Sequence, residues 1–275
     1  MGKLSNLFDD YLLFKKCIKV YPFLMKDYDL FEEVTSILLF DKNKIPDIKI
    51  VKMSYLKFLL SVVPYIVDDK GNKPYVDMQE KINKLLNYVF KDQEYQIGYT
   101  NDQKIIIRVK TNLNEFDNSN LNDVIPQYID INEQDFNNLK NLILNQNAIP
   151  TIDETLHPDL RKALEENMQY MAEKQGYNEG TIEEQVISYK CEMKLFNYKQ
   201  IKNMSIYQFR QELLRLDLIK DFQIYKTAEM SGMVTFSKAI PHWRSHISNV
   251  PDYSNLLIDK KVLDSKMDEV LNNKY

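Results

Sequence analysis

The chain has 275 residues, of which 44% are hydrophobic and 28% are charged, so it can bury a core and is not a disordered tail. Its formal net charge of -4 supplies no uniform positive field, which disfavours nucleic acid and anionic membranes as partners. Six glycines leave little material for phosphate-binding loops. We therefore expect a protein that needs no cofactor and has no enzymatic activity.

The cysteines and the N-terminus indicate where the protein acts. Cys17 and Cys191 lie far apart, and neither belongs to a Cys-x-x-Cys metal or redox motif, so we expect reduced thiols. Charged residues interrupt the apolar N-terminus, and no stretch approaches the roughly 18 apolar residues of a membrane span. The expected location is the cytoplasm of the cell that makes the protein, with no membrane partner.

The first half of the chain alternates between strand and helix signals. A strand is expected near residues 16–23, and Pro22 indicates that it is an edge strand or that it ends there. Apolar steps of three and four residues predict a helix over 26–40. Residues 53–63 are nearly continuously apolar and fit a buried helix or a strand, but Lys57 and the length favour a helix. The segment between these two helices, 41–52, is expected to break the helical pattern.

The next segments predict a small antiparallel sheet. Residues 78–90 are predicted to form an amphipathic helix. Two β-rich runs at 94–99 and 103–110 follow it, joined by a short polar connector typical of a hairpin. A turn at 68–74 precedes the helix. An Asn-rich loop at 112–122 follows the hairpin, and a third strand is expected over 124–131. Asn132 then caps a helix that reaches about residue 145.

The chain beyond residue 150 is predicted to be mainly helical. Expected helices cover 158–174, 181–195, 206–231 and 259–272; Thr181 with Glu184 forms a capping box, Ser205 caps the longest helix, and Gly232 ends it. We therefore predict an α+β fold with a mixed domain at 1–149 and a helical domain at 150–275. An extended apolar arm at about 232–247 belongs to the second domain.

Motifs for catalysis or metal binding are weak. His242 and His246 are four residues apart, as two zinc ligands on one helix turn would be, but Trp243 stands where a zinc protease has its Glu. His157 is the third histidine of the chain. Surface or packing roles are the preferred interpretation, and a lysine cluster within 42–57 is better explained as a soluble loop than as an anion site. No metal ligands are assigned.

The arm carries the strongest functional signal. Methionine adapts to partners of different shape, and tryptophan is frequent at binding hot spots. Two interpretations remain open: the arm docks on another protein, or it folds back over its own helices. The predicted partner-binding residues are Met230, Met233, Phe236, Ile240 and Trp243.

Four segments resemble proteins from the tail gene clusters of tailed phages and prophages of low-GC Gram-positive hosts. They read YKTAEMSGMVTFSKAIPHW, KNMSIYQFRQELLRLD, IPTIDETLHPDLRKALEE and DKNKIPDIKIVKMSYLKFLL. The resemblance is to the tail assembly chaperone or baseplate-hub assembly group. It implies a non-enzymatic protein that holds tape-measure, tube or baseplate-hub proteins in the host cytoplasm. Self-association into a homo-oligomer is a further option. The alternative is a structural subunit retained in the virion tail or baseplate.

Overall fold

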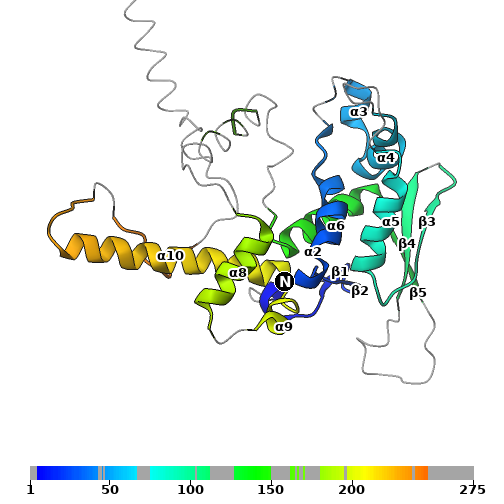
Figure 1. The fold of residues 1–275 in the computed structure, drawn as a ribbon. Coiled ribbons are helices and arrows are strands. Elements are labelled where there is room, and N and C mark those ends of the chain that lie inside the picture. Colours follow the sequence, from blue (N-terminus) through cyan, green and yellow to red (C-terminus); the bar gives the residue numbers. More distant parts are fainter. Residues whose placement is uncertain are drawn as a thin grey trace, which may run out of the picture.

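The computed structural model confirms the predicted α+β class, with helices and two small antiparallel sheets (Figure 1). The residues that it describes are 5–42, 45, 47–66, 75–102, 104–111, 127–149, 162–164, 166, 170, 180–194, 197–236 and 239–246. The turn expected at 68–74, the loop at 112–122, most of the helix at 158–174 and the terminal helix at 259–272 lie outside these residues.

A short hairpin opens the fold after helix α1 (Ser5–Phe8). Strand β1 (Leu12–Phe14) pairs antiparallel with β2 (Ile18–Val20), and the predicted strand at 16–23 contains only the second of them. The turn between them places Lys15 and Lys16 at φ of 49° and 68°. Glycine or asparagine normally marks this left-handed region, so two lysines hide the turn in the sequence.

Helices form the middle of the molecule and confirm the predicted helices over 26–40, 53–63 and 78–90. The elements are η1 (Met25–Asp27), α2 (Tyr28–Thr35), η2 (Ser36–Leu39), α3 (Ile48–Lys52), α4 (Tyr55–Ser61), η4 (Val63–Tyr65) and α5 (Met78–Val89). The short helix α3 lies where we expected the chain only to break. It begins because the Asp47 carboxylate accepts the Lys49 backbone N–H at 2.7 Å and caps it.

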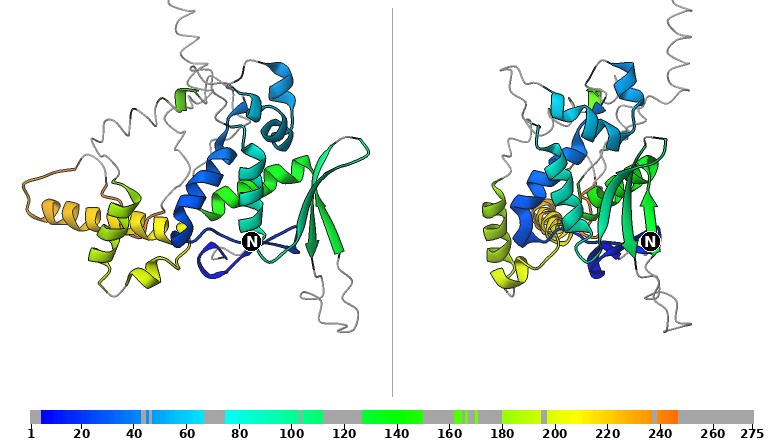
Figure 2. Two further views of the ribbon diagram at one scale, coloured as in Figure 1. Left: turned by 45° about the vertical axis from the view of Figure 1, so that its right-hand side comes forward. Right: turned by 90° about the vertical axis from the view of Figure 1, so that its right-hand side faces the viewer.

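The predicted sheet and the helix after it are also confirmed. Strands β3 (Tyr95–Tyr99), β4 (Ile105–Thr111) and β5 (Gln127–Ile131) pair antiparallel in the order β3-β4-β5. Helix α6 (Glu133–Gln146) starts at a capping box between Asn132 and Asp135. One face of the sheet packs toward α5 and α6 (Figure 2) and buries Ile107 and Val109.

The C-terminal helices α8 (Ile182–Glu192), α9 (Tyr198–Ile201) and α10 (Ile206–Met230) complete the described fold. The capping box of Thr181 and Glu184 and the Ser205 cap form as predicted. Tyr189, Ile206 and Phe209 belong to the same buried cluster as the helices of the first half. The division of the chain at residue 150 stays a prediction, but the two parts share one core.

Candidate partner-binding site at the end of helix α10

Helix α10 is fixed at its beginning by the backbone of the first half. The Ile206 N–H donates to the Phe23 carbonyl at 2.9 Å, and the Met25 N–H donates to the Met204 carbonyl at 2.9 Å. The Ser205 hydroxyl accepts the Gln208 N–H and caps the helix at the same place. Since the side chains of Ile206 and Phe209 are fully buried, the first turns of α10 are part of the core.

Three side chains on the first turns strengthen this attachment. Phe209 contacts Tyr189 edge to face with ring centroids 5.3 Å apart, and the Tyr189 hydroxyl donates a short hydrogen bond to Glu212. Burial, together with this bond to a carboxylate, raises the pKa of Tyr189, so the phenol stays protonated. Arg210 donates to the Asn147 carbonyl at 3.3 Å and so holds α10 to the end of α6.

Beyond these turns α10 projects from the body of the molecule (Figure 1). Ile206 and Phe209 are its only buried residues, and Ile224 is 63% exposed. The Lys220 ammonium makes an ion pair with Glu192 of α8 at 3.0 Å, which supports the middle of the helix from one side. The far half of α10 is therefore a projecting helix whose first turns are fixed in the core.

The projecting helix ends at Met230, and Gly232 follows its C-cap as the predicted stop. This glycine has φ of +72°, a conformation that other residues adopt at a cost, and it reverses the chain. The chain then returns along α10, where Phe236 packs edge to face on Tyr225 at 5.6 Å between ring centroids and His242 lies 5.1 Å from Phe222. We define the tip of this turn as residues 230–234; it lies at the projecting end of α10 (Figure 1).

Arg215 holds the returning arm against the helix. Its Nη1 atom donates to the Trp243 carbonyl at 2.6 Å and to the Ser245 carbonyl at 2.9 Å. The Arg244 guanidinium lies 4.5 Å from the centroid of the Trp243 ring, and His242 stacks on the same ring. These contacts fix the arm in a folded-back position along α10.

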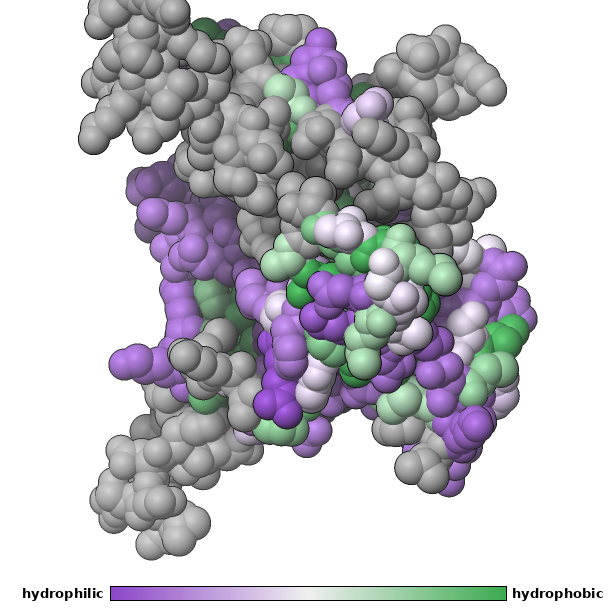
Figure 3. Space-filling view, turned by 90° about the vertical axis from the view of Figure 1, so that its left-hand side faces the viewer, coloured by the Kyte–Doolittle hydropathy of each residue, from purple (hydrophilic) through white to green (hydrophobic). Residues whose placement is uncertain are grey.

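The five predicted partner-binding residues fall into two groups. Met230 and Met233, at the tip, are 86% and 90% exposed and are the most exposed large apolar side chains of the described residues. Phe236, Ile240 and Trp243 are half-buried along the returning arm. The space-filling view facing this end of the molecule shows apolar side chains set among polar ones (Figure 3).

Sequence reasoning did not assign a role to Arg215 or Ile224. Arginine is rare in this lysine-rich chain, and its planar fork can serve two carbonyls where an ammonium is a point charge, so each arginine was a signal of required geometry. Ile224 lies on the projecting part of α10, and no local pattern distinguishes an exposed apolar residue from a buried one.

Of the two histidines of HWRSH, His242 packs against aromatic rings, whereas His246 is exposed. The Nδ1 atom of His242 accepts the Arg244 backbone N–H at 3.1 Å. Among the described residues, no group of three or more His, Cys, Asp or Glu side chains is placed to hold a metal ion. Every helix in the described part of the chain is too short or too polar to cross a membrane.

Residues 173–248 match the family described as the YomV second domain, which is associated with phages. The match spans α8, α9, α10 and the returning arm, so it coincides with the projecting unit and its supports. It indicates a phage protein. No curated protein and no solved structure matches the chain.

Proposed function

We propose that the chain is a non-enzymatic morphogenesis protein of a phage tail or baseplate, which binds other tail proteins through the tip of α10 in the host cytoplasm. The observation that supports this proposal most strongly is the exposure of Met230 and Met233 at the end of a projecting helix whose first turns are buried. The phage-associated family match covers the same unit, and the resemblance to tail assembly proteins supplies the partner class. Tape-measure, tube and baseplate-hub proteins are the proposed partners.

The size of the tip favours transient binding. Complete burial of a methionine side chain contributes about 1.5–3 kcal/mol, so the two methionines supply about 3–6 kcal/mol. A dissociation constant of 1 μM requires about 8 kcal/mol after the costs of association. A partner must therefore also contact the side of the projecting helix, where Ile224 and Tyr225 are exposed. Permanent subunit interfaces are larger and more apolar, which makes a retained structural subunit the second candidate.

A photo-crosslinking residue placed at position 233 during phage production tests the site. The expected result is an adduct with a tape-measure, tube or baseplate-hub protein. The matched control carries the crosslinker at Val76, which is also exposed, at 72%, but belongs to the segment before α5. Equal adducts at both positions, or none with a tail protein at 233, would contradict the proposal.

Analysis of finished particles separates the two candidates. For a transient chaperone, mass spectrometry of purified infectious particles finds the tail proteins but not this chain. A defined copy number relative to the tube protein would instead establish a retained tail or baseplate subunit.

A further inference from the structure

The edge strand β3 directs a row of backbone groups away from its sheet. The Lys110 N–H donates to the Glu94 carbonyl at 2.8 Å, and the Thr100 N–H donates to the Lys104 carbonyl at 2.9 Å. Because hydrogen-bonded positions alternate along an antiparallel pair, the even-numbered residues between them face β4. The N–H and C=O groups of Tyr95, Ile97 and Tyr99 therefore point to the open edge.

The opposite edge of the same sheet carries a charged side chain on its backbone. On β5 the Asp130 carbonyl points outward and accepts a hydrogen bond from the Lys15 ammonium at 2.9 Å. Lys15 also forms an ion pair with Asp135 at 2.6 Å, which holds it in place. Lysines and charges of this kind protect sheet edges from further pairing.

Strand β3 has no such protection. Its sequence, Tyr-Gln-Ile-Gly-Tyr, contains no charge and no proline, and none of its residues is buried. Within the described residues, no hydrogen bond involves the backbone groups of Tyr95, Ile97 or Tyr99. An uncharged open edge of this kind is a template for another strand.

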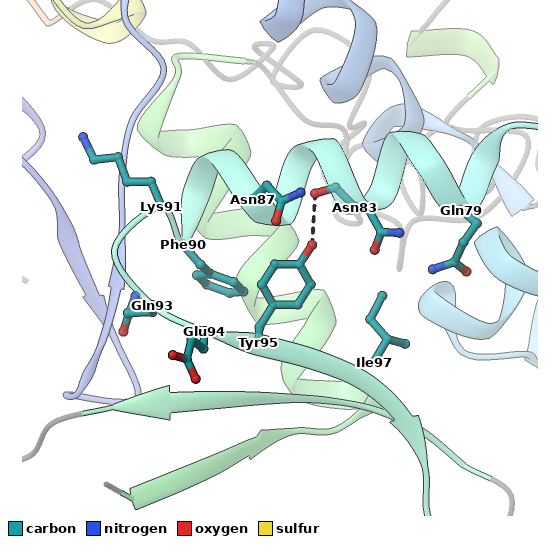
Figure 4. A pocket seen from close by; sticks show the side chains of 9 residues that line it. All are labelled: Gln79, Asn83, Asn87, Phe90, Lys91, Gln93, Glu94, Tyr95 and Ile97. Carbon is teal, nitrogen blue, oxygen red and sulfur yellow. Dashed lines mark hydrogen bonds between the residues drawn. The ribbon is translucent and has the colours of Figure 1, made fainter.

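A mainly polar groove accompanies this edge, with Lys91 and Glu94 as its charged lining residues (Figure 4). Helix α5 lines it with Gln79, Asn83 and Asn87, which are spaced four residues apart and so share one side of the helix. Tyr95 crosses the groove and donates from its hydroxyl to the Asn83 carbonyl at 3.1 Å. A carboxamide both donates and accepts hydrogen bonds, so this row can pair with an identical row.

We propose that strand β3 pairs antiparallel with β3 of a second copy of the chain, on a twofold axis through Ile97. The strand is nearly palindromic about this residue. In that register Ile97 faces its own copy and Tyr95 faces Tyr99 of the other chain, so apolar side chains meet and no like charges do. The two sheets join into one, and the carboxamides of the two α5 helices approach each other.

The strand length sets the strength of this contact. Each facing pair of residues exchanges two bonds, which gives about six main-chain hydrogen bonds in all. Two five-residue strands and their flanking helices form a small interface, so the dimer is expected to dissociate on dilution.

Opposite charges at position 97 test the twofold register on the full-length chain. In a concentration series by analytical ultracentrifugation, wild type changes from monomer to dimer. Ile97→Lys and Ile97→Glu each abolish the dimer, because identical charges then face each other. An equimolar mixture of the two variants restores a dimer that contains one chain of each kind.

Ile129→Lys is the matched control, since Ile129 is a half-buried isoleucine on the other edge strand, and it leaves the dimer intact. Circular dichroism verifies that every variant is folded. A wild-type chain that stays monomeric would overturn the proposal and leave the edge of β3 to a different protein. Charge variants that fail to combine would overturn it as well, because position 97 would then not face its own copy. Neither result bears on the tip of α10.

Discussion

Truncation of Phe209 tests whether α10 begins inside the common core. The side chain is fully buried and contacts Tyr189 edge to face, so Phe209→Ala removes the ring and leaves a cavity. Large-to-small changes of a buried phenylalanine cost about 3–5 kcal/mol. A domain of ordinary stability unfolds with about 5–15 kcal/mol, so this one change removes a substantial part of the total.

Urea unfolding followed by circular dichroism measures this loss. We expect a lower transition midpoint with a single transition, because the α10 base and the first half of the chain share their buried cluster. Ile224→Ala on the same helix is the control; its side chain is 63% exposed, and the expected change is at most about 0.5 kcal/mol. A loss below about 1 kcal/mol for Phe209→Ala, or a separate early transition, would refute the shared core.

Three further predictions concern the arm, the thiols and the sheet. Arg215→Ala releases the arm and shifts the fluorescence of Trp243, the only tryptophan, to longer wavelength, whereas Lys226→Ala, which removes an ion pair within α10, leaves it unchanged; an unshifted spectrum for Arg215→Ala would contradict the clamp. In the native protein iodoacetamide modifies the exposed Cys191 first, because burial raises the pKa of the Cys17 thiol; equal rates, measured by peptide mass spectrometry, would contradict this. The Arg108 guanidinium lowers the pKa of the Asp130 carboxyl. The ionised carboxylate therefore stabilises the fold above about pH 4, and this stabilisation is lost as the pH falls through the folded-state pKa of Asp130. Asp130→Asn should remove this part of the pH dependence in thermal unfolding, and an unchanged pH profile would contradict it.

Local signals in the sequence predicted most of the described helices and strands. Asn132, Thr181 and Ser205 each begin a helix because a cap depends on residues within one turn of it. Strand β1 and helix α3 were missed because no clear local signal marks them. Lys15 and Lys16 adopt a left-handed turn that their side chains do not signal, and α3 is a five-residue helix inside a polar segment.

The site depended on contacts between distant residues. The sequence indicated an apolar arm, but its position along α10 follows from the two carbonyls that Arg215 binds nearly 30 residues away. The exposure of Met230 and Met233 likewise results from the projection of α10, which no periodicity predicts. Hydrophobic spacing identifies which residues favour burial, while tertiary packing decides which of them remain exposed.

On the proposed function, tail assembly needs the apolar tip of α10, and genetic complementation tests this requirement. A phage that lacks this gene is supplied with wild type or with the double variant Met230→Asp, Met233→Asp, and the particles are counted by electron microscopy. The variant alters only exposed side chains, so it should remain folded by circular dichroism. We predict tailed particles with wild type and tailless heads with the folded variant; normal tails with that variant would show that assembly does not need the tip.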